Sequence, residues 1–130
     1  MGCVPGFHGE RGYMVMAAYT LITGATGGIG LEFAKIFAAR GSSLILVARN
    51  EGRLKKIQWA LESAYGVDVE VISADLAEER APEKIYRYVK SQGWRVQILV
   101  NNVGFGDHNC FFDTRWQRHK NMIDVNITAL

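Results

Sequence analysis

A glycine-rich segment near the start of the chain, Gly24-Ala25-Thr26-Gly27-Gly28-Ile29-Gly30, has the residue types and spacing of a phosphate-binding loop. Phosphate oxygens are bound by backbone N–H groups and by the amino end of a helix, and side chains would obstruct that approach. Gly24 can make the tight turn, Gly28 can admit a phosphate, and Gly30 can let a helix pack closely on a strand. The pattern predicts a dinucleotide site, although a glycine-rich turn without a ligand would use similar residues.

A second chemical signal follows the apolar run Leu44-Ile45-Leu46-Val47, where the sequence continues as Ala48-Arg49-Asn50. In a dinucleotide-binding fold, a carboxylate at the end of this strand holds the ribose 2′-hydroxyl of NAD, whereas a nearby arginine accommodates the 2′-phosphate of NADP. Arg49 can present its planar fork to a phosphate, and no carboxylate stands beside it. We therefore predict NADP(H) in preference to NAD(H), the alternative being an ordinary solvated arginine.

The elements that must position these residues alternate between strand and helix. Short β-prone runs predict strands at 19–22, 44–47, 67–72 and 96–100. Helical spacing of apolar residues predicts helices at 28–40, between Asn50 and Gly66, from Pro82 to Gly93, and from about Thr114 onward. This order is typical of right-handed crossovers, so we expect a Rossmann-like, doubly wound parallel sheet in a three-layer αβα arrangement.

The apolar side chains of the expected helices recur every three or four residues. The first helix carries Ile29, Phe33, Ile36 and Phe37, and the second is expected to place Leu54, Ile57, Leu61 and Ala64 on one face. The third should turn Ile85 and Val89 inward. The last helix has an apolar face that suits either the core or a dimer contact, formed by Trp116, Ile123, Ile127 and Leu130.

Composition limits the domain organisation and the classes of partner. Residues 1–17 have scattered glycines and no periodicity, so we expect a flexible lead-in followed by an incomplete NAD(P)-binding domain over 18–130. Fifteen Lys and Arg against thirteen Asp and Glu give a net charge of +2 with interspersed signs, which does not suggest nucleic acid. Cys3 and Cys110 lack metal-ligand spacing, and no apolar run could span a bilayer. We predict a cytoplasmic protein without a metal or a membrane segment.

The glycine segment also carries a resemblance to a known family. Thr23, Gly24, Gly28 and Gly30 match the Thr-Gly-x-x-x-Gly-x-Gly pattern of the short-chain dehydrogenase/reductase (SDR) family. Gly27 additionally satisfies the Thr-Gly-x-x-Gly-x-x-Gly pattern of the family's extended branch, which includes nucleotide-sugar epimerases and dehydratases. The later segment Asn101-Asn102-Val103-Gly104 is similar to the Asn-Asn-Ala-Gly of the shorter oxidoreductase branch, and it favours that branch.

The resemblance implies roles for further residues. Asp75 and Leu76 correspond to the residues beside the adenine ring, although an aspartate after a strand could equally cap a helix. Asn126, in Asp124-Val125-Asn126-Ile127, matches the asparagine of the family's Asn, Ser, Tyr, Lys tetrad, so its implied role is catalytic; the alternative is an asparagine facing solvent. The residues that the resemblance and the loop chemistry together assign to cofactor binding are Gly24, Thr26, Gly28, Ile29, Gly30, Arg49, Asn50, Asp75, Leu76, Asn102, Val103 and Gly104.

The tyrosine and lysine that the family uses as its proton donor and activating group have no counterpart after Asn126. The one Tyr-x-x-x-Lys spacing, Tyr86 to Lys90, precedes the Asn segment and is better interpreted as an exposed helical pair. We therefore expect the cofactor-binding half of an NADP-dependent carbonyl or alcohol oxidoreductase, inactive alone, and we hypothesise that the 130 residues are a fragment of a longer reading frame. An extended-branch epimerase or dehydratase fragment and a non-catalytic dinucleotide-binding module stay open as alternatives. For the full-length protein, the resemblance implies a small-molecule carbonyl or alcohol substrate and a homodimer or tetramer.

Overall fold

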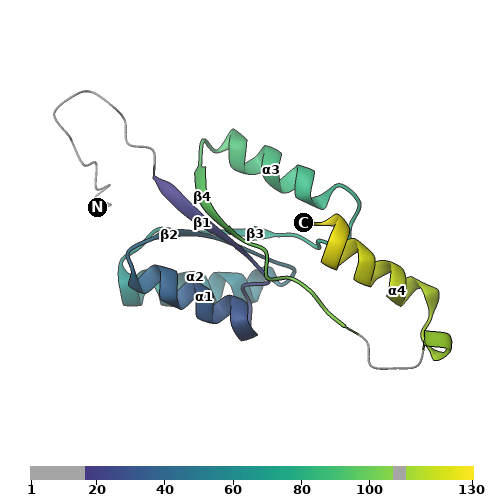
Figure 1. The fold of residues 1–130 in the computed structure, drawn as a ribbon. Coiled ribbons are helices and arrows are strands. Elements are labelled where there is room, and N and C mark those ends of the chain that lie inside the picture. The colour runs from purple at the N-terminus through teal and green to yellow at the C-terminus, as the bar shows by residue number, and fades with distance from the viewer. Residues whose placement is uncertain (1–16, 107–110) are drawn as a thin grey trace.

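The computed structural model describes residues 17–106 and 111–130, and these residues form a parallel β-sheet between two layers of helices (Figure 1). The four strands lie in the order β3-β2-β1-β4, and each neighbouring pair is parallel. Their bounds are β1 Ala18–Thr23, β2 Ser43–Ala48, β3 Val69–Ser73 and β4 Arg95–Val100. The predicted Rossmann-like αβα fold is confirmed. The flexible lead-in expected over residues 1–17 lies outside the described part except for its last residue, and it stays a prediction.

The helices lie on both faces of the sheet and beyond its carboxyl end. Figure 1 shows α1 and α2 together on one face and α3 on the other, while α4 lies beyond the carboxyl ends of the strands. Their bounds are α1 Gly28–Ala39, α2 Glu51–Tyr65, α3 Ala81–Ser91 and α4 Trp116–Ile123. The last helix continues as a π-helical turn over Asp124–Thr128, and a short 3-10 turn at Phe111–Asp113 precedes it. All four helices begin within a few residues of the predicted positions.

The core is divided by the sheet into two clusters. Side chains alternate across a strand, so Leu44 and Leu46 of β2 pack against α1 and α2, whereas Ile45 and Val47 pack against α3. All four are fully buried. A continuous apolar run is what a central parallel strand covered on both faces requires. In register, Leu21 of β1 pairs with Ile45 on one side and Leu99 of β4 on the other.

The buried side of α1 differs from the one that its apolar spacing suggests. The helix buries Gly30, Ala34 and Ala38, while Ile29, Phe33 and Ile36 are exposed; of the expected face, only Phe37 packs against the core. Small residues let the helix backbone approach the strands closely, and the larger side chains then point away from the sheet. On α2, Leu54 and Leu61 are buried as expected, whereas Ala64 is exposed. On α3, Ile85 and Val89 face inward as expected.

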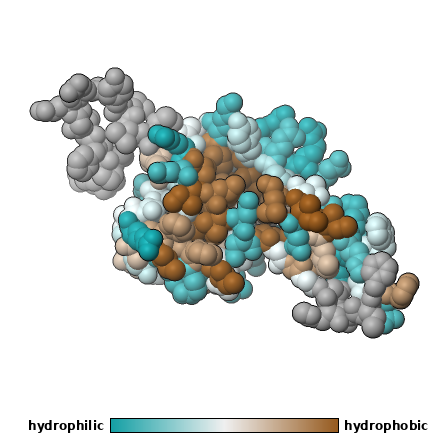
Figure 2. Space-filling model, in the orientation of Figure 1, coloured by the Kyte–Doolittle hydropathy of each residue, from teal (hydrophilic) through white to brown (hydrophobic). Residues whose placement is uncertain are grey.

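Exposed apolar side chains also occur on β4 and on the last helix. Val96, Ile98 and Leu99 of the edge strand β4 are exposed, and apolar surface gathers over β4 and along α1 in Figure 2. The interpretation of the last helical stripe as core is wrong, because all four of its members are exposed: Trp116, Ile123, Ile127 and Leu130. Within the described residues, no helix has the length and apolar character needed to cross a membrane, and no group of three or more His, Cys, Asp or Glu could hold a metal ion.

Glu70 on the edge strand β3 makes the stability of the fold depend on pH. Burial raises the pKa of its carboxyl, and the negative charges of Glu62 and Asp68 raise it further. The folded state therefore holds the Glu70 proton more tightly than the unfolded chain does. The stabilisation from this group is complete below the unfolded pKa and is lost as the pH rises through the folded pKa.

We expect Glu70→Gln to increase the free energy of unfolding at about pH 7 by less than about 1 kcal/mol, because the unfavourable charge is removed from a half-buried position. The difference between variant and parent should shrink as the pH falls toward about 4, because the raised pKa makes the parent carboxyl take up its proton at a higher pH than it does in the unfolded chain. Urea unfolding at both pH values measures this. A difference that grows in acid would contradict the assignment.

Candidate functional site

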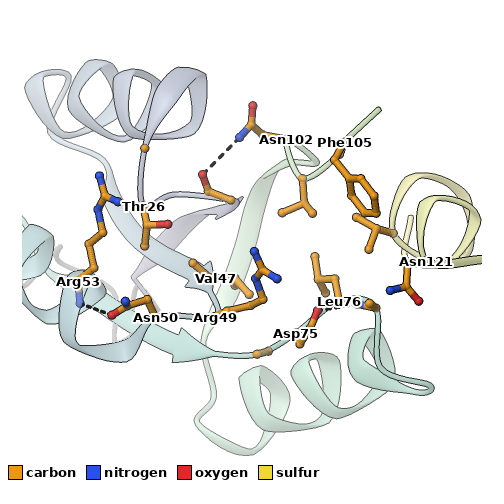
Figure 3. A pocket seen from close by; sticks show the side chains of 18 of the residues that line it. Thr26, Val47, Arg49, Asn50, Arg53, Asp75, Leu76, Asn102, Phe105 and Asn121 are labelled. Atoms are coloured by element: carbon orange, nitrogen blue, oxygen red, sulfur yellow. Dashed lines mark hydrogen bonds between the residues drawn. The ribbon is translucent and has the colours of Figure 1, made fainter. Parts of the chain in front are cut away.

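A cavity of about 760 Å³ opens at the carboxyl end of the sheet (Figure 3). In open α/β sheets, ligands bind at this end, at the point where neighbouring strands lead to helices on opposite faces. Here β1 leads into α1 on one face, and its neighbour β4 leads toward α4, which lies beyond the carboxyl ends of the strands. Nine of the sequence-predicted residues line the cavity: Gly24, Thr26, Arg49, Asn50, Asp75, Leu76, Asn102, Val103 and Gly104.

The glycine loop has the backbone geometry of a phosphate cradle. Gly24 has a positive φ of 66°, and its N–H donates to the Val47 carbonyl at 2.8 Å. Gly28, with φ 54°, begins α1, and a Cβ added there would meet nothing within 4 Å. The amino end of α1 therefore faces open space that an anion can enter. This geometry fits the phosphates of a dinucleotide.

Gly30 has a packing role rather than a direct place in the cavity. A Cβ on Gly30 would overlap the Gly24 carbonyl oxygen and would lie 2.6 Å from Asn102 Nδ2. The absence of a side chain thus lets α1 cross directly over the end of β1. Gly28, Ile29 and Gly30 do not line the cavity, and Ile29 is an exposed residue of α1.

The residues after β2 combine a helix cap with a cation. Asn50 Oδ1 accepts a hydrogen bond from the Arg53 N–H at 2.9 Å and so caps α2, as its type and position suggest. The Arg49 backbone is held by Ser73, whose Oγ donates to the Arg49 carbonyl at 3.0 Å. The Arg49 side chain points into the cavity in Figure 3. Among the described residues, no carboxylate lies within ion-pair distance of it.

Thr23, at the end of β1, joins that strand to the end of β4 and the segment after it, at the floor of the site. Its Oγ1 accepts hydrogen bonds from the backbone N–H groups of Asn102 (2.9 Å) and Val103 (3.2 Å), and it donates to the Val100 carbonyl at 3.4 Å. The Asn102 side chain returns the connection, since its Nδ2 donates to the Thr23 carbonyl at 3.2 Å. Sequence reasoning used Thr23 only as part of a pattern, but the structure shows that it fixes the segment that forms one wall of the cavity.

Asp75 and Leu76 lie beyond the carboxyl end of β3. Asp75 Oδ1 accepts from the Ala77 N–H at 3.0 Å, which makes a local turn, and α3 begins only at Ala81. The alternative that Asp75 caps this helix is therefore wrong. Leu76 packs into the core cluster beneath the cavity while still contributing to its lining. From the same turn, Asp75 can present a polar surface to a ligand and Leu76 an apolar one.

Asn126 lies in the π-helical turn and holds the loop that follows β4. Its Oδ1 accepts from the Phe105 N–H at 3.1 Å, and its Nδ2 donates to the Phe105 carbonyl at 2.8 Å. A Cβ on Gly104 would lie only 3.1 Å from Asn126 Oδ1, so the glycine allows this close approach. Asn126 does not line the cavity, and the alternative of a side chain facing solvent without partners is wrong. Within the described residues, its side chain acts as a positioning group.

Several cavity residues were not predicted as site residues. They include Arg53 on α2, Phe105 on the loop, and three residues of the last helical segment, Arg118, Asn121 and Val125. The spacing of Arg118, Asn121 and Val125 places them on one helical face, a signal that was present in the sequence. The Arg118 guanidinium lies 6.0 Å from the centre of the Phe105 ring, so these two lining residues also contact each other.

Comparison with known proteins gives the family. The sequence model of the family described as short chain dehydrogenase matches residues 18–130. The chain belongs to the short-chain dehydrogenase/reductase family. Its glycine loop, its four-stranded parallel sheet and its segment after β4 are thus features of an SDR protein, and the resemblance inferred from the sequence is confirmed.

Three similar proteins illustrate the match. The very-long-chain 3-oxoacyl-CoA reductase of Kluyveromyces lactis is 33% identical over 115 residues, which cover 86% of this chain and 33% of that protein. The structure of a short-chain dehydrogenase from Sphingobium yanoikuyae in complex with NADPH superposes with a TM-score of 0.80 at 35% identity, covering 86% of this chain and 43% of that one. L-Sorbose reductase from Gluconobacter frateurii, complexed with NADPH and L-sorbose, gives 0.80 at 29% identity, covering 88% and 43%. The chain spans about a third of the length of the curated relatives.

Proposed function

We propose that the chain forms the cofactor-binding part of an NADP(H)-dependent oxidoreductase that transfers hydride between the cofactor and a small carbonyl or alcohol substrate. Membership of the SDR family supports oxidoreductase chemistry, and the similar proteins described above are named as reductases or dehydrogenases. The preference for NADP rests chiefly on Arg49, a guanidinium that faces the cavity at the end of β2 without a carboxylate partner among the described residues.

The chain's own residues would divide the binding between three parts of the cavity. The amino end of α1 beyond Gly28 would hold the pyrophosphate, and Asp75 with Leu76 would lie beside the adenine. Asn102, Val103 and Gly104 would form the wall along the rest of the cofactor, held in place by Thr23 and Asn126. When bound, NADP(H) supplies or accepts the hydride. The tyrosine and lysine that the resemblance assigns to proton transfer have no counterpart after Asn126 in this chain, which spans about a third of the length of its curated relatives.

Replacing Arg49 by alanine tests the cofactor preference. We expect Arg49→Ala to weaken NADPH binding by about tenfold or more, because a charge-assisted fork to the 2′-phosphate is lost, and to change NADH binding by less than about twofold. Titration of the cofactor fluorescence measures both affinities. Arg95→Ala is a matched control, since Arg95 is an exposed arginine at the amino end of β4 and does not line the cavity. Equal loss of NADPH and NADH binding in Arg49→Ala would refute the preference.

Two further proposals concern the protein rather than the site. A cytoplasmic location follows only from composition and stays a prediction. A homodimer or tetramer is compatible with the exposed apolar residues of the last helical segment, such as Trp116 and Ile127. Size-exclusion chromatography with light scattering would measure the oligomeric state.

A further inference from the structure

Arg53 reaches from α2 to the glycine loop. Its backbone N–H donates to Asn50 Oδ1, which fixes it in the first turn of α2 beside Arg49. Its side chain extends toward the start of α1 in Figure 3, and its Nη2 lies 3.7 Å from the position of a Cβ on Gly27. Arg53 therefore lines the same cavity as Arg49, from the side opposite Asp75.

The charges around Arg53 leave its guanidinium available to an anion. The nearest acidic residue of the helix, Glu51, is paired with Lys55 at 2.7 Å. In the ranges that the structure describes, no carboxylate is within ion-pair distance of Arg53 or Arg49. Two unneutralised guanidinium groups that face one cavity attract an anion more strongly than either group alone. Asp75, beyond Arg49, disfavours an anion on its own side, so the favoured position is between the two arginines.

We propose that Arg53 is a second specificity-determining residue for the cofactor, and that it binds the ribose 2′-phosphate together with Arg49. The inference rests on the proposed function and adds a residue to it. Arg49 and Arg53 flank Asn50, at the strand end where the ribose of a dinucleotide lies. A phosphate monoester carries nearly two negative charges at neutral pH, so two planar forks can bind it at once.

Gly27 makes room for this side chain. Its backbone is extended, with φ 179° and ψ 177°, a conformation open to any residue. A methyl group there would contact Arg53 Nη2 at an ordinary distance, whereas a branched side chain would displace the guanidinium. Gly27→Val is therefore a second way to move Arg53 without removing its charge.

The test uses two small nucleotides that differ only in the 2′-phosphate, 2′,5′-ADP and 5′-AMP, and titration calorimetry with the 130-residue chain. We expect Arg53→Ala to weaken 2′,5′-ADP binding by about tenfold or more and 5′-AMP binding by less than about twofold. Arg53→Lys should lose part of the affinity, because an ammonium lacks the planar fork. Gly27→Val should lower the ratio of the two affinities in the same direction. Lys56→Ala, which removes an exposed charge of α2 outside the cavity, should leave both affinities unchanged.

Different outcomes separate this inference from the proposed function. If the parent chain binds 2′,5′-ADP no better than 5′-AMP, the NADP preference itself fails. If the parent prefers 2′,5′-ADP and Arg49→Ala loses that preference while Arg53→Ala retains it, only the role of Arg53 is overturned. Equal weakening of both nucleotides in Arg53→Ala also overturns it, because the side chain would then contact the 5′-phosphate. Circular dichroism of Arg53→Ala checks that this exposed substitution leaves the fold intact.

Discussion

Substitution of Gly30 by alanine is expected to lower the free energy of unfolding by at least about 2 kcal/mol, because the added methyl group would clash with backbone that cannot move aside as a flexible side chain could. The added methyl group would overlap the Gly24 carbonyl oxygen, a backbone atom, and would lie 2.6 Å from Asn102 Nδ2. Either α1 must move away from the sheet or the glycine loop must open. Both movements also disturb the phosphate cradle, so binding of NADPH should weaken together with stability.

Urea unfolding of the chain, followed by circular dichroism, measures the loss. Gly27→Ala is the matched control, because it adds the same methyl group to the same loop in an extended conformation with 3.7 Å of clearance to Arg53. Its stability should be unchanged or slightly higher, since alanine restricts the unfolded chain more than glycine does. Equal unfolding midpoints for Gly30→Ala and the parent would show that the close crossing of α1 over β1 does not constrain residue 30.

The strands and the cofactor end of the sheet could be predicted because their signals are local. Leu44 to Val47 is a continuous apolar run, and only a strand covered on both faces makes use of it. The buried side of α1 could not be predicted in this way. Ile29, Phe33 and Ile36 have the stronger hydrophobicity, but closeness to the sheet favours the smaller residues Ala34 and Ala38. Which side of a helix is buried depends on how near its partner lies, and hydropathy does not record that distance.

The candidate site likewise contains residues that local sequence could predict and residues whose place depends on the folded structure. Arg49 and the glycines were found because each carries its chemistry in its own type and neighbours. Arg53 was missed because its place in the cavity depends on a side chain that spans from α2 to Gly27. Asn126 was identified from its motif, yet its hydrogen bonds to the Phe105 backbone are long-range contacts that arise only when the last helical segment packs against the loop. The π-helical turn that contains Asn126 has no sequence signature either.

Thr23 shows how a single buried hydroxyl can couple stability to binding. We expect Thr23→Val to lower the free energy of unfolding by about 2–4 kcal/mol, because the backbone N–H groups of Asn102 and Val103 both lose their acceptor. The substitution keeps the shape of a nearly buried side chain, so the loss comes from hydrogen bonding rather than from a cavity. Since Asn102 and Val103 line the candidate site, nucleotide affinity should fall as well.

Two variants on β1 isolate this effect. Thr23→Ser restores the hydroxyl and should recover most of the stability. Thr20→Val should be close to neutral, because Thr20 is also buried in the same strand, and, unlike Thr23, its hydroxyl does not hold the segment after β4 within the described part of the chain. Urea unfolding measures the stability, and calorimetric titration with NADPH measures the affinity.

If Thr23→Val and Thr20→Val destabilise the chain equally, the loss of stability follows from removing any hydroxyl from this strand and not from the bonds of Thr23. If Thr23→Val alone is destabilising and affinity falls with it, the wall formed by Asn102 to Gly104 depends on β1 for its position. The glycine loop and this wall would then be two sides of one hydrogen-bonded unit, because Thr23 directly precedes Gly24 and its side chain holds the segment after β4.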